Sequence, residues 1–337
     1  MSYATQIITT ENEYSALEGE WQELLESSAT NQVFQSFSFL NTWWHTFNPG
    51  EISIIAVREE GTLVALAPLF IQKESGKTHL KLLGCINVSD YLDVLVQKKL
   101  QAELYPVLLA VIDELIWDSL EWCSLPEESP SRMWLKQFFS DATVSEKQQD
   151  VCPQIELLNT WESYLTGLDR KQRHEIRRKE RRLQAFEHKF EEILQPTTTD
   201  VADFIRLHKE SSREKKSFWD DTHLNFFRHV LPNLGKQGWL RLFFLSIEGT
   251  RAASMIIFDY NQQFQLYNSG FLLKEFRELG VGSLLTAHTI KRAIEEKKVR
   301  YDFLRGNEAY KFRYTNTAKP IFDITITRDR QPANQPQ

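Results

Sequence analysis

One short segment in the second half of the chain has the residue types of an anion-binding turn: Arg277-Glu278-Leu279-Gly280-Val281-Gly282-Ser283. Gly280 and Gly282 carry no side chains, so backbone N–H groups there can point at an anion, and an amphipathic run follows them. No Asp or Glu lies between Gly280 and Lys291, which suits an anion at the positive end of a helix dipole. The pattern predicts a phosphate group held at a helix start. A turn that only packs a helix against a strand has the same glycine pattern.

The length and composition indicate a globular protein of two domains. A chain of 337 residues exceeds one ordinary hydrophobic core, and its content of 42% hydrophobic and 12% aromatic residues is not that of a disordered chain. Residues 1–14 are polar and lack the apolar stretch of a signal peptide. The longest apolar run, residues 64–71, is far shorter than the roughly 20 residues that cross a bilayer. We therefore expect a soluble, cytoplasmic protein.

The cysteines and histidines show no spacing typical of a metal site or a redox pair. Cys85, Cys123 and Cys152 are widely separated, so we expect three buried thiols in a reducing compartment. No cluster of His, Cys, Asp or Glu has metal-ligand spacing, and we expect no metal. The isolated histidines are expected on helix surfaces or in the core: His174, His208 and His288.

Charge is divided unevenly along the chain. Residues 1–150 carry 9 Lys and Arg against 22 Asp and Glu, a net charge of −13, and the remainder has a net charge of +7, which gives −6 overall. A basic second half indicates an anionic ligand for that half. A basic solvated face opposite an acidic one would give the same numbers.

The two halves share an internal repeat. Residues 54–70 and 242–258 each contain an alternating apolar strand, then Glu-Gly-Thr, then a second apolar strand, at an offset of 188 residues. The glycines, Gly61 and Gly249, supply the positive φ that a tight hairpin turn requires. A helical pattern precedes each hairpin, and a further strand, a helix and a last strand follow each of them.

This repeat predicts an α/β (α+β) fold in which each half is a mixed sheet flanked by helices. We expect an N-terminal lobe over residues 1–150, a C-terminal lobe over 151–330 and a frayed tail over 331–337. The boundary is placed in the polar residues 140–154, which break both the helical and the strand periodicity.

A strongly basic helix is expected just after this boundary. Residues 161–190 have a helical stripe of apolar side chains, and Gly167-Leu168-Asp169 is expected to split them into two helices with Asp169 as the N-cap of the second. Eight cations lie in residues 170–182 against only Glu175 and Glu180. Such a face can hold a phosphorylated ligand, although a simply solvated face has the same composition.

Several separate stretches of the second half together form a recognisable set. They are Trp161, Tyr164-Leu165, Arg173, Ile176-Arg177-Arg178, Leu183, Gly238-Trp239, Arg241-Leu242, Tyr267-Asn268-Ser269-Gly270, Leu279-Gly280-Val281-Gly282, Tyr301-Asp302-Phe303-Leu304-Arg305-Gly306, Glu308 and Tyr310-Lys311. This set resembles the GNAT acyltransferases, and more narrowly the branch that contains CelD-type proteins and the Fem aminoacyl-transfer enzymes. The resemblance covers about residues 150–320, and the first half matches more weakly through its hairpin and Ser89-Asp90-Tyr91-Leu92-Asp93. Members of this branch carry two GNAT-like folds in tandem.

The resemblance implies an acyl-CoA donor, acetyl-CoA included. Arg277 and the N–H groups of Leu279, Gly280, Val281, Gly282 and Ser283 would hold its pyrophosphate. Asn268 and Ser269 would lie on the splayed strand that admits the pantetheine arm and the acyl carbonyl, with Gly270 at a bulge where the ligand approaches the backbone.

The resemblance also implies acid–base residues and contacts to the acceptor. Asp302 or Glu308 would take the proton of the attacking amine, and Tyr310 would protonate the leaving thiolate. Asp302 is equally compatible with a buried carboxylate paired with Arg305 or Lys311, and Tyr310 with a core aromatic residue. The residues expected to contact the acceptor are Arg173, Arg177, Tyr267, Arg305 and Lys311.

The sequence therefore favours an acyl-CoA-dependent N-acyltransferase. Its acceptor would be a small-molecule amine or an amine-bearing precursor of cell-envelope polysaccharide or lipid. One alternative is a Fem-like transfer from aminoacyl-tRNA to a cell-wall precursor, although the pI of 5.8 argues against tRNA. The other is a non-catalytic acyl-CoA-binding regulatory module. We expect no DNA partner and no transmembrane segment, and peripheral membrane contact stays open. Residues 94–99 stand where the first lobe would carry its donor turn, and they lack the glycines.

Overall fold

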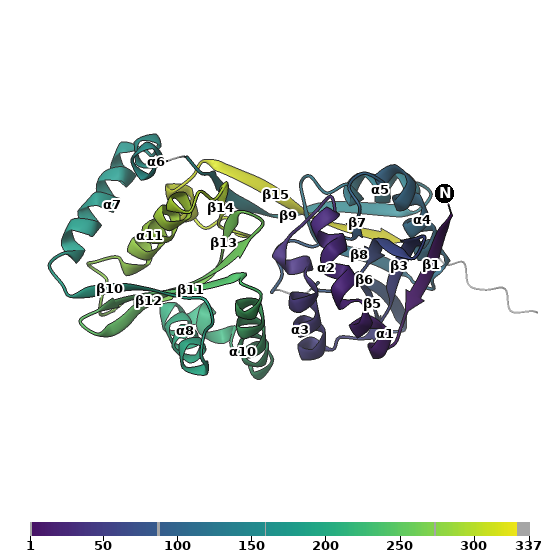
Figure 1. Cartoon of the computed structure of the whole chain (residues 1–337), viewed down its shortest axis with the longest axis horizontal. Helices are drawn as coiled ribbons and strands as arrows, with labels where there is room; N and C mark the ends of the chain where they lie inside the picture. The colour runs from purple at the N-terminus through teal and green to yellow at the C-terminus, as the bar shows by residue number, and fades with distance from the viewer. Residues whose placement is uncertain (1, 86–87, 159, 273, 329–337) are drawn as a thin grey trace, which may run out of the picture. The chain divides into compact units, whose positions relative to one another are not determined.

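The computed structural model describes residues 2–85, 88–158, 160–272 and 274–328, and it divides into two compact units. Unit 1 comprises Met1–Asp150 with Pro320–Gln337, and unit 2 comprises Val151–Lys319 (Figure 1). Residues 320–328 therefore lie with the first unit, whereas the sequence-based division placed them in the second. The reason is strand pairing, because β15 (Thr317–Thr327) is antiparallel to β8 (Ser119–Pro126).

The division between the two units falls after Asp150, within the polar residues 140–154 in which the sequence placed the boundary. They belong to a 14-residue strand, β9 (Thr143–Glu156). Most of its residues up to Val151 are exposed or half-buried and polar, so its sequence lacks the apolar alternation by which strands are recognised.

In unit 1 the strands form two sets, in the orders β1-β3-β4-β7 and β15-β8-β6-β5-β2. The remaining strands are β1 (Tyr3–Ile8), β2 (Glu51–Ile52), β3 (Ile54–Glu59), β4 (Thr62–Ala67), β5 (Leu69–Glu74), β6 (Lys77–Leu82) and β7 (Leu95–Val96). The helices are α1 (Glu11–Ala16), α2 (Glu18–Ser27), η1 (Val33–Gln35), α3 (Phe37–Phe47), α4 (Gln101–Glu114) and α5 (Ser131–Phe138).

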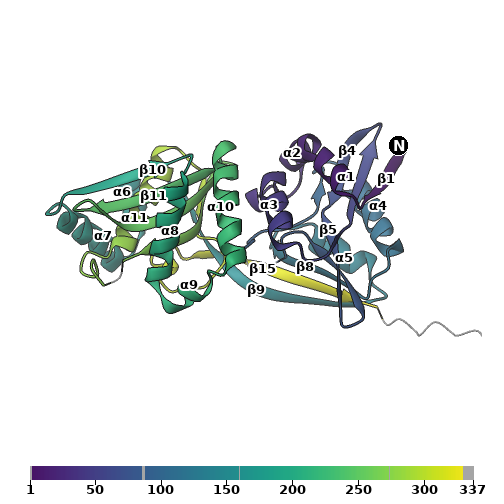
Figure 2. The ribbon, with the colours of Figure 1, turned by 90° about the horizontal axis from the view of Figure 1, so that it is seen from below.

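In unit 2 the strand order is β10-β11-β12-β13-β14-β9. Helices α6, α7 and α11 lie on one face of this sheet and α8 and α10 on the other; Figure 2 shows α8, α9 and α10 together. The strands are β10 (His188–Ile193), β11 (Leu240–Ile247), β12 (Thr250–Tyr260), β13 (Gln263–Phe271) and β14 (Arg300–Asp302). The helices are α6 (Trp161–Gly167), α7 (Arg170–Leu183), α8 (Thr198–Ser211), α9 (Arg213–Ser217), α10 (Asp221–Lys236), α11 (Val281–Glu295) and η2 (Lys311–Arg313).

The two predicted hairpins are confirmed as β3–β4 and β11–β12. Each turn has two consecutive residues with positive φ: 49° and 86° at Glu60 and Gly61, and 48° and 73° at Glu248 and Gly249. Two-residue hairpin turns of this kind match the right-handed twist of the flanking strands. The glutamates, and not only the glycines, adopt the left-handed conformation.

The basic helix is partly as predicted. Asp169 is the N-cap of α7, and its side chain accepts a hydrogen bond of 2.9 Å from the N–H of Gln172. The helix ends at Leu183, however, and the expected continuation to residue 190 is wrong because His188–Ile193 forms β10. Phe190 packs against the core of unit 2 from this edge strand instead of from a helix.

The cysteine prediction is wrong for two of the three residues. Cys85 and Cys123 form a disulfide with a Cα–Cα distance of 5.9 Å, and only Cys152 is a buried free thiol. Parallel pairing of β6 with β8 brings the ends of these two strands together, and no spacing along the sequence reports such a contact. Among the described residues, no helix is long and apolar enough to cross a membrane. The tail over residues 331–337 lies outside the described residues.

Candidate functional site

The N-terminus of α11 presents unbonded backbone donors. Gly280 is its N-cap, with φ of 63°, and the N–H of Leu284 donates to the carbonyl of Gly280 at 3.1 Å. The amides of Val281, Gly282 and Ser283 belong to the first turn, which has no intrahelical acceptors for them. The first two predicted donors, the amides of Leu279 and Gly280, bond instead to the carbonyl of Phe276 at 3.2 Å each. Three of the five predicted amides thus have no hydrogen-bond acceptor among the described residues.

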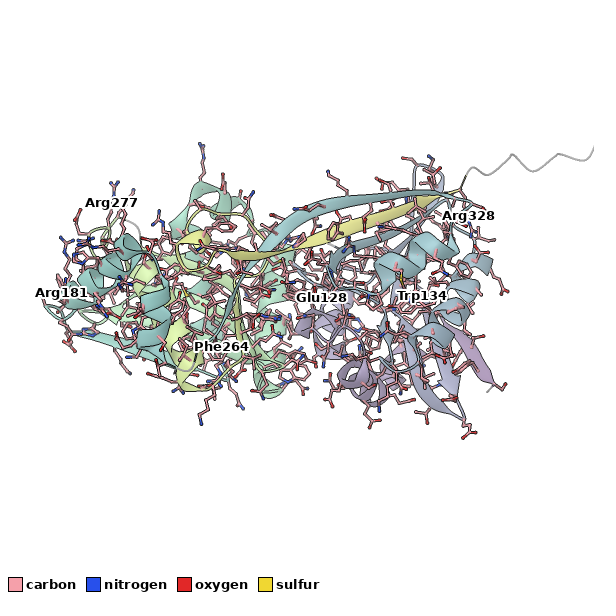
Figure 3. The ribbon with its side chains drawn as sticks, turned by 90° about the horizontal axis from the view of Figure 1, so that it is seen from above. Glu128, Trp134, Arg181, Phe264, Arg277 and Arg328 are labelled. Carbon is pink, nitrogen blue, oxygen red and sulfur yellow. A yellow bond between two sulfur atoms is a disulfide. The ribbon has the colours of Figure 1, made fainter. Side chains whose placement is uncertain are left out.

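Cations from α7 surround this helix start. Lys179 Nζ donates to Ser283 Oγ at 3.0 Å, and Arg182 Nη1 donates to the carbonyl of Glu278 at 3.3 Å. Burial lowers the pKa of Lys179, and Glu175 opposes the effect. A Cβ on Gly280 would lie 2.7 Å from the end of the flexible Lys179 side chain, and it is the φ of 63° that favours a glycine here. Arg277 is exposed at the same end of unit 2 as Arg181 (Figure 3).

Strand β13 opens away from its neighbour beside this turn. It pairs in parallel with β14 only over residues 263–265, and β14 ends at Asp302. The register with β12 shifts at Tyr267, the signature of a β-bulge. Among the described strands, none pairs with residues 268–271 on the side away from β12. The backbone of Asn268 and Ser269 therefore forms an open edge to which an extended ligand can bind.

Gly270 has a different role from the one predicted. The bulge lies at Tyr267, and a Cβ on Gly270 would lie 2.3 Å from the backbone nitrogen of His208. Gly270 is therefore required for the close approach of α8 to β13, and a ligand is not what approaches it.

His208 holds the side chain of Asn268. Its Nδ1 accepts a hydrogen bond of 2.9 Å from the indole N–H of Trp219, so the proton lies on Nε2, which is 3.1 Å from Asn268 Oδ1. Burial lowers the pKa of His208 to about 3, with a smaller contribution from Lys215. A neutral imidazole in a fixed tautomer thus orients one residue of the open edge.

A second cluster lies at the same edge: Lys215, Glu308 and Lys311. Lys215 Nζ donates to the carbonyl of Ser269. Lys311 is 3% exposed, donates to the carbonyl of Arg305 at 2.7 Å and pairs with Glu308 at 3.0 Å. Burial lowers the pKa of Lys215 to about 8, while Glu308 raises it and Lys311 lowers it.

Asp302 is a buried structural carboxylate. It is 1% exposed and accepts hydrogen bonds from Gln154 Nε2 at 2.9 Å and from the N–H of Leu304 at 2.7 Å. Leu304 has a φ of 55°, so the second hydrogen bond stabilises a left-handed backbone conformation that does not occur in a regular strand. Lys311 pairs with Glu308, and not with Asp302 as one sequence-based alternative has it.

Tyr310 follows Glu308 on the loop that leads into η2. Burial of the hydroxyl raises its pKa above the ordinary value, and Glu308 adds to the effect. The residue as a whole is 37% exposed. A phenol with these properties stays protonated at neutral pH and can donate its proton.

Residues 170–312 match the model of the acetyltransferase (GNAT) domain family. They form a GNAT domain. The match includes α7, the β11–β12 hairpin, the opened strand β13, the start of α11 and the loop through Lys311. No curated protein matches the sequence.

Solved structures show that the GNAT domain belongs to a larger fold that they share with the whole chain. The structure of FemX is similar over 97% of this chain and 98% of that chain, at 10% identity and a TM-score of 0.68. The structure of L-PGS from Bacillus licheniformis is similar over 96% of this chain and 94% of that chain, at 12% identity and a TM-score of 0.58. The structure of a tandem GNAT protein from the clavulanic acid biosynthesis pathway is similar over 98% of this chain and 100% of that chain, at 10% identity and a TM-score of 0.50. At these identities the likeness extends to the fold alone.

The predicted acceptor residues on α7 have partners on α6, within unit 2. Arg173 donates to the carbonyl of Thr166 at 3.0 Å, and so covers the C-terminus of α6. Arg177 pairs with Glu162 of α6 at 2.8 Å. Both arginines therefore hold α6 against α7, and the structure does not bring them to the Lys215 cluster.

The other predicted acceptor residues lie near the open edge. Tyr267 stacks on Phe258 and Phe227, with ring centroids 4.6 and 5.8 Å apart. Arg305 is half-buried and supplies a carbonyl to Lys311.

Sequence-based prediction missed Lys179, His208 and Lys215 as members of the site. Lys179 belongs to the basic run of residues 170–182 that the sequence analysis noted. The sequence does not show that this lysine lies beside Ser283 at the start of α11. His208 and Lys215 lie on α8 and α9, some sixty residues from Asn268 and Ser269. Neither has a local sequence signal.

A surface hollow of about 660 Å³ elsewhere in the GNAT domain does not contain these groups. It is lined by charged residues that neutralise one another, chiefly Arg251, which pairs with Asp200 and Asp203 at 2.9 Å each. The guanidinium also lies 3.9 Å from the centroid of the Phe244 ring. We therefore assign this hollow a structural role.

Proposed function

We propose that the protein is an acyl-CoA-dependent N-acyltransferase that transfers its acyl group to an amine. The observation that carries this proposal is the adjacency of two donor features. The first turn of α11 offers three backbone amides beside Lys179, and the open edge of β13 begins next to it. A Cβ on Gly282 would lie 3.2 Å from the ring of Phe271, the last residue of β13, so the turn and the strand edge are in contact.

Each donor feature suits a different part of acyl-CoA. The pyrophosphate would accept hydrogen bonds from the amides of Val281, Gly282 and Ser283, with Lys179 and Arg277 as counter-charges. The amide groups of the pantetheine arm would pair with the edge backbone of Asn268 and Ser269, apart from the Ser269 carbonyl, which accepts a hydrogen bond from Lys215, as an added strand does at a sheet edge. The thioester carbonyl would then lie at the open part of β13.

The transfer needs one proton acceptor and one proton donor. Glu308 would take a proton from the ammonium form of the acceptor, directly or through water, and the neutral amine would attack the thioester carbonyl. The C–N bond forms, the C–S bond breaks, and Tyr310 would protonate the leaving thiolate. The proton that the attacking nitrogen then loses would return to the Tyr310 phenolate through water, and Glu308 would release its proton to solvent. Asp302 is the weaker candidate for the base because both of its oxygens already accept hydrogen bonds within the protein.

Thiol release tests this proposal directly. Acetyl-CoA and a long-chain acyl-CoA are incubated with a panel of amines, and free CoA is measured with wild type and with Glu308→Gln. We expect amine-dependent release that falls at least about 100-fold in the variant, the usual contribution of a general base. Release in wild type that does not depend on any amine would overturn the proposal.

Fem-like transfer from aminoacyl-tRNA is a second candidate, supported by the exposed cations of α7. Arg170, Lys171 and Arg181 are exposed, and within the described residues none of them has an ion-pair partner. A gel shift with bulk tRNA at increasing salt distinguishes this function, since phosphate contacts make binding salt-dependent. Salt-sensitive binding that is lost in a triple alanine variant of these residues would favour it over CoA. Absence of a shift at low salt would exclude it.

A further inference from the structure

We propose that the acceptor carries an anionic group, a carboxylate or a phosphate, close to its amine, and that Lys215 binds this anion. This inference rests on the proposed function, because it names the substrate class of the same site. It follows from the hydrogen bonding and the charge balance of Lys215, Glu308 and Lys311.

Lys311 has no donor left for a ligand. An ammonium group has three N–H donors. Those of Lys311 are directed to the carbonyl of Leu304 at 3.2 Å, to the carbonyl of Arg305 at 2.7 Å and to Glu308 Oε2 at 3.0 Å. Lys311 therefore holds the loop and neutralises Glu308.

Lys215 differs from Lys311 because one of its three ammonium N–H donors is used within the protein. It donates to the carbonyl of Ser269, a neutral group, and its ammonium lies 5.7 Å from the centroid of the Phe271 ring. Its other two N–H donors have no hydrogen-bond acceptor among the residues that the structure describes. An acceptor with an anionic group would satisfy them with charge-assisted hydrogen bonds, which are the stronger kind.

The charges of the cluster do not balance. The buried ammonium group of Lys311 and the half-buried one of Lys215 share one carboxylate, Glu308, and Glu308 is already paired with Lys311. Burial without a full counter-charge destabilises the charged form of Lys215, which explains why its pKa falls to about 8. A bound anion would supply the missing charge.

The location of Lys215 determines where such an anion would lie. Its partner, Ser269, belongs to the open edge of β13, next to Asn268, which His208 orients. On the proposed function the thioester lies on this same edge. An anion held by Lys215 would therefore place an amine attached to the same small molecule near the acyl carbonyl.

Matched acceptors test the inference. Glycine is compared with glycinamide, and O-phosphoethanolamine with ethanolamine, as acceptors for wild type, Lys215→Met and Lys215→Arg. The control is Lys216→Met, which changes an exposed neighbour on the same helix. CoA binding to each protein is measured in parallel by calorimetry.

We expect wild type to prefer the anionic member of at least one pair by about tenfold or more in kcat/KM, the size of one charge-assisted hydrogen bond. Lys215→Met should lose this preference, Lys215→Arg should keep part of it, and Lys216→Met should keep all of it. The pair that shows the preference distinguishes a carboxylate from a phosphate.

Other outcomes separate the two proposals. Equal kcat/KM for both members of both pairs, or a preference that survives in Lys215→Met, overturns the anion site. If wild type binds CoA in the same experiment, the proposed donor site stands. If no acceptor turns over, calorimetric titration of the CoA-bound protein with O-phosphoethanolamine and with glycine decides. Absence of Lys215-dependent binding then overturns the inference, whereas absence of CoA binding to wild type overturns the proposed function.

Discussion

Lys179 Nζ lies 3.0 Å from Ser283 Oγ, which joins the basic helix α7 to the first turn of α11. The lysine is half-buried there, and within the described part of the chain only Glu175, at 3.5 Å, offers it a carboxylate. A cation held beside these three amides suits a doubly charged pyrophosphate better than the amides alone would.

Removal of this cation should weaken donor binding. Lys179→Met keeps the aliphatic stem, and we expect its Kd for CoA to rise by about tenfold, as loss of one charge-assisted bond implies. Isothermal titration measures the change. Lys171→Met, an exposed cation on the same helix, is the control and should leave the Kd unchanged. Equal effects of the two substitutions would mean that α7 acts only through its overall charge.

The two acidic residues should respond differently to amide substitution. Glu308→Gln should lower kcat while CoA binding and the free energy of unfolding change little. Asp302→Asn should lower the free energy of unfolding by about 1–3 kcal/mol, because an amide cannot accept both buried hydrogen bonds. Urea unfolding and thiol release of both variants check this. A stable but inactive Asp302→Asn protein would transfer the role of base to Asp302.

Gly306 should be required for the loop that carries Glu308. Its φ is 123°, and a Cβ there would lie 2.3 Å from Glu308 Oε2. We expect Gly306→Ala to destabilise the protein by about 1–3 kcal/mol, because a strained backbone conformation adds to the displaced ion pair. Thermal unfolding measures this. Gly167→Ala, where a Cβ meets no atom within 4 Å, should be neutral, and similar losses in both variants would argue against the strain.

Burial of His208 should make stability depend on pH in acid. The pKa of His208 is lowered from 6.5 to about 3 in the folded protein. Between these values the unfolded chain binds a proton that the folded protein excludes, so the free energy of unfolding rises with pH, by at most about 1.4 kcal/mol per unit for one such group. Urea unfolding at pH 7.5 and pH 5.0 should show a smaller difference for His208→Gln than for wild type.

The exposed His229 provides the control, since His229→Gln should keep the wild-type difference. His288, whose burial lowers its pKa to about 4, leaves some pH dependence in both variants. An unchanged difference in His208→Gln would show that His208 is not buried in its neutral form.

The features predictable from the sequence are those that depend on local backbone chemistry. The Glu60-Gly61 and Glu248-Gly249 turns, the N-cap at Asp169 and the helix start after Gly280 are each determined by residues within a few positions. The chemistry at these places is the same in any fold that contains them.

What the sequence could not predict depends on contacts between distant segments. Cys85 meets Cys123 only because β6 and β8 pair in parallel, and β9 is a strand whose exposed polar side chains hide it. Lys215 reaches Ser269 from a five-residue helix 54 positions earlier in the chain. The cluster that we propose to bind the acceptor could therefore be found only from the structure.

The central claim is that the start of α11 holds acyl-CoA. Calorimetric titration of CoA into wild type, Gly282→Trp and Gly19→Trp tests it most directly. Gly282→Trp should place an indole among the donor amides, whereas a side chain on Gly19 meets no atom within 4 Å. We predict that wild type and Gly19→Trp bind CoA and that Gly282→Trp does not. Equal binding by all three proteins, or no binding to wild type, would contradict the account.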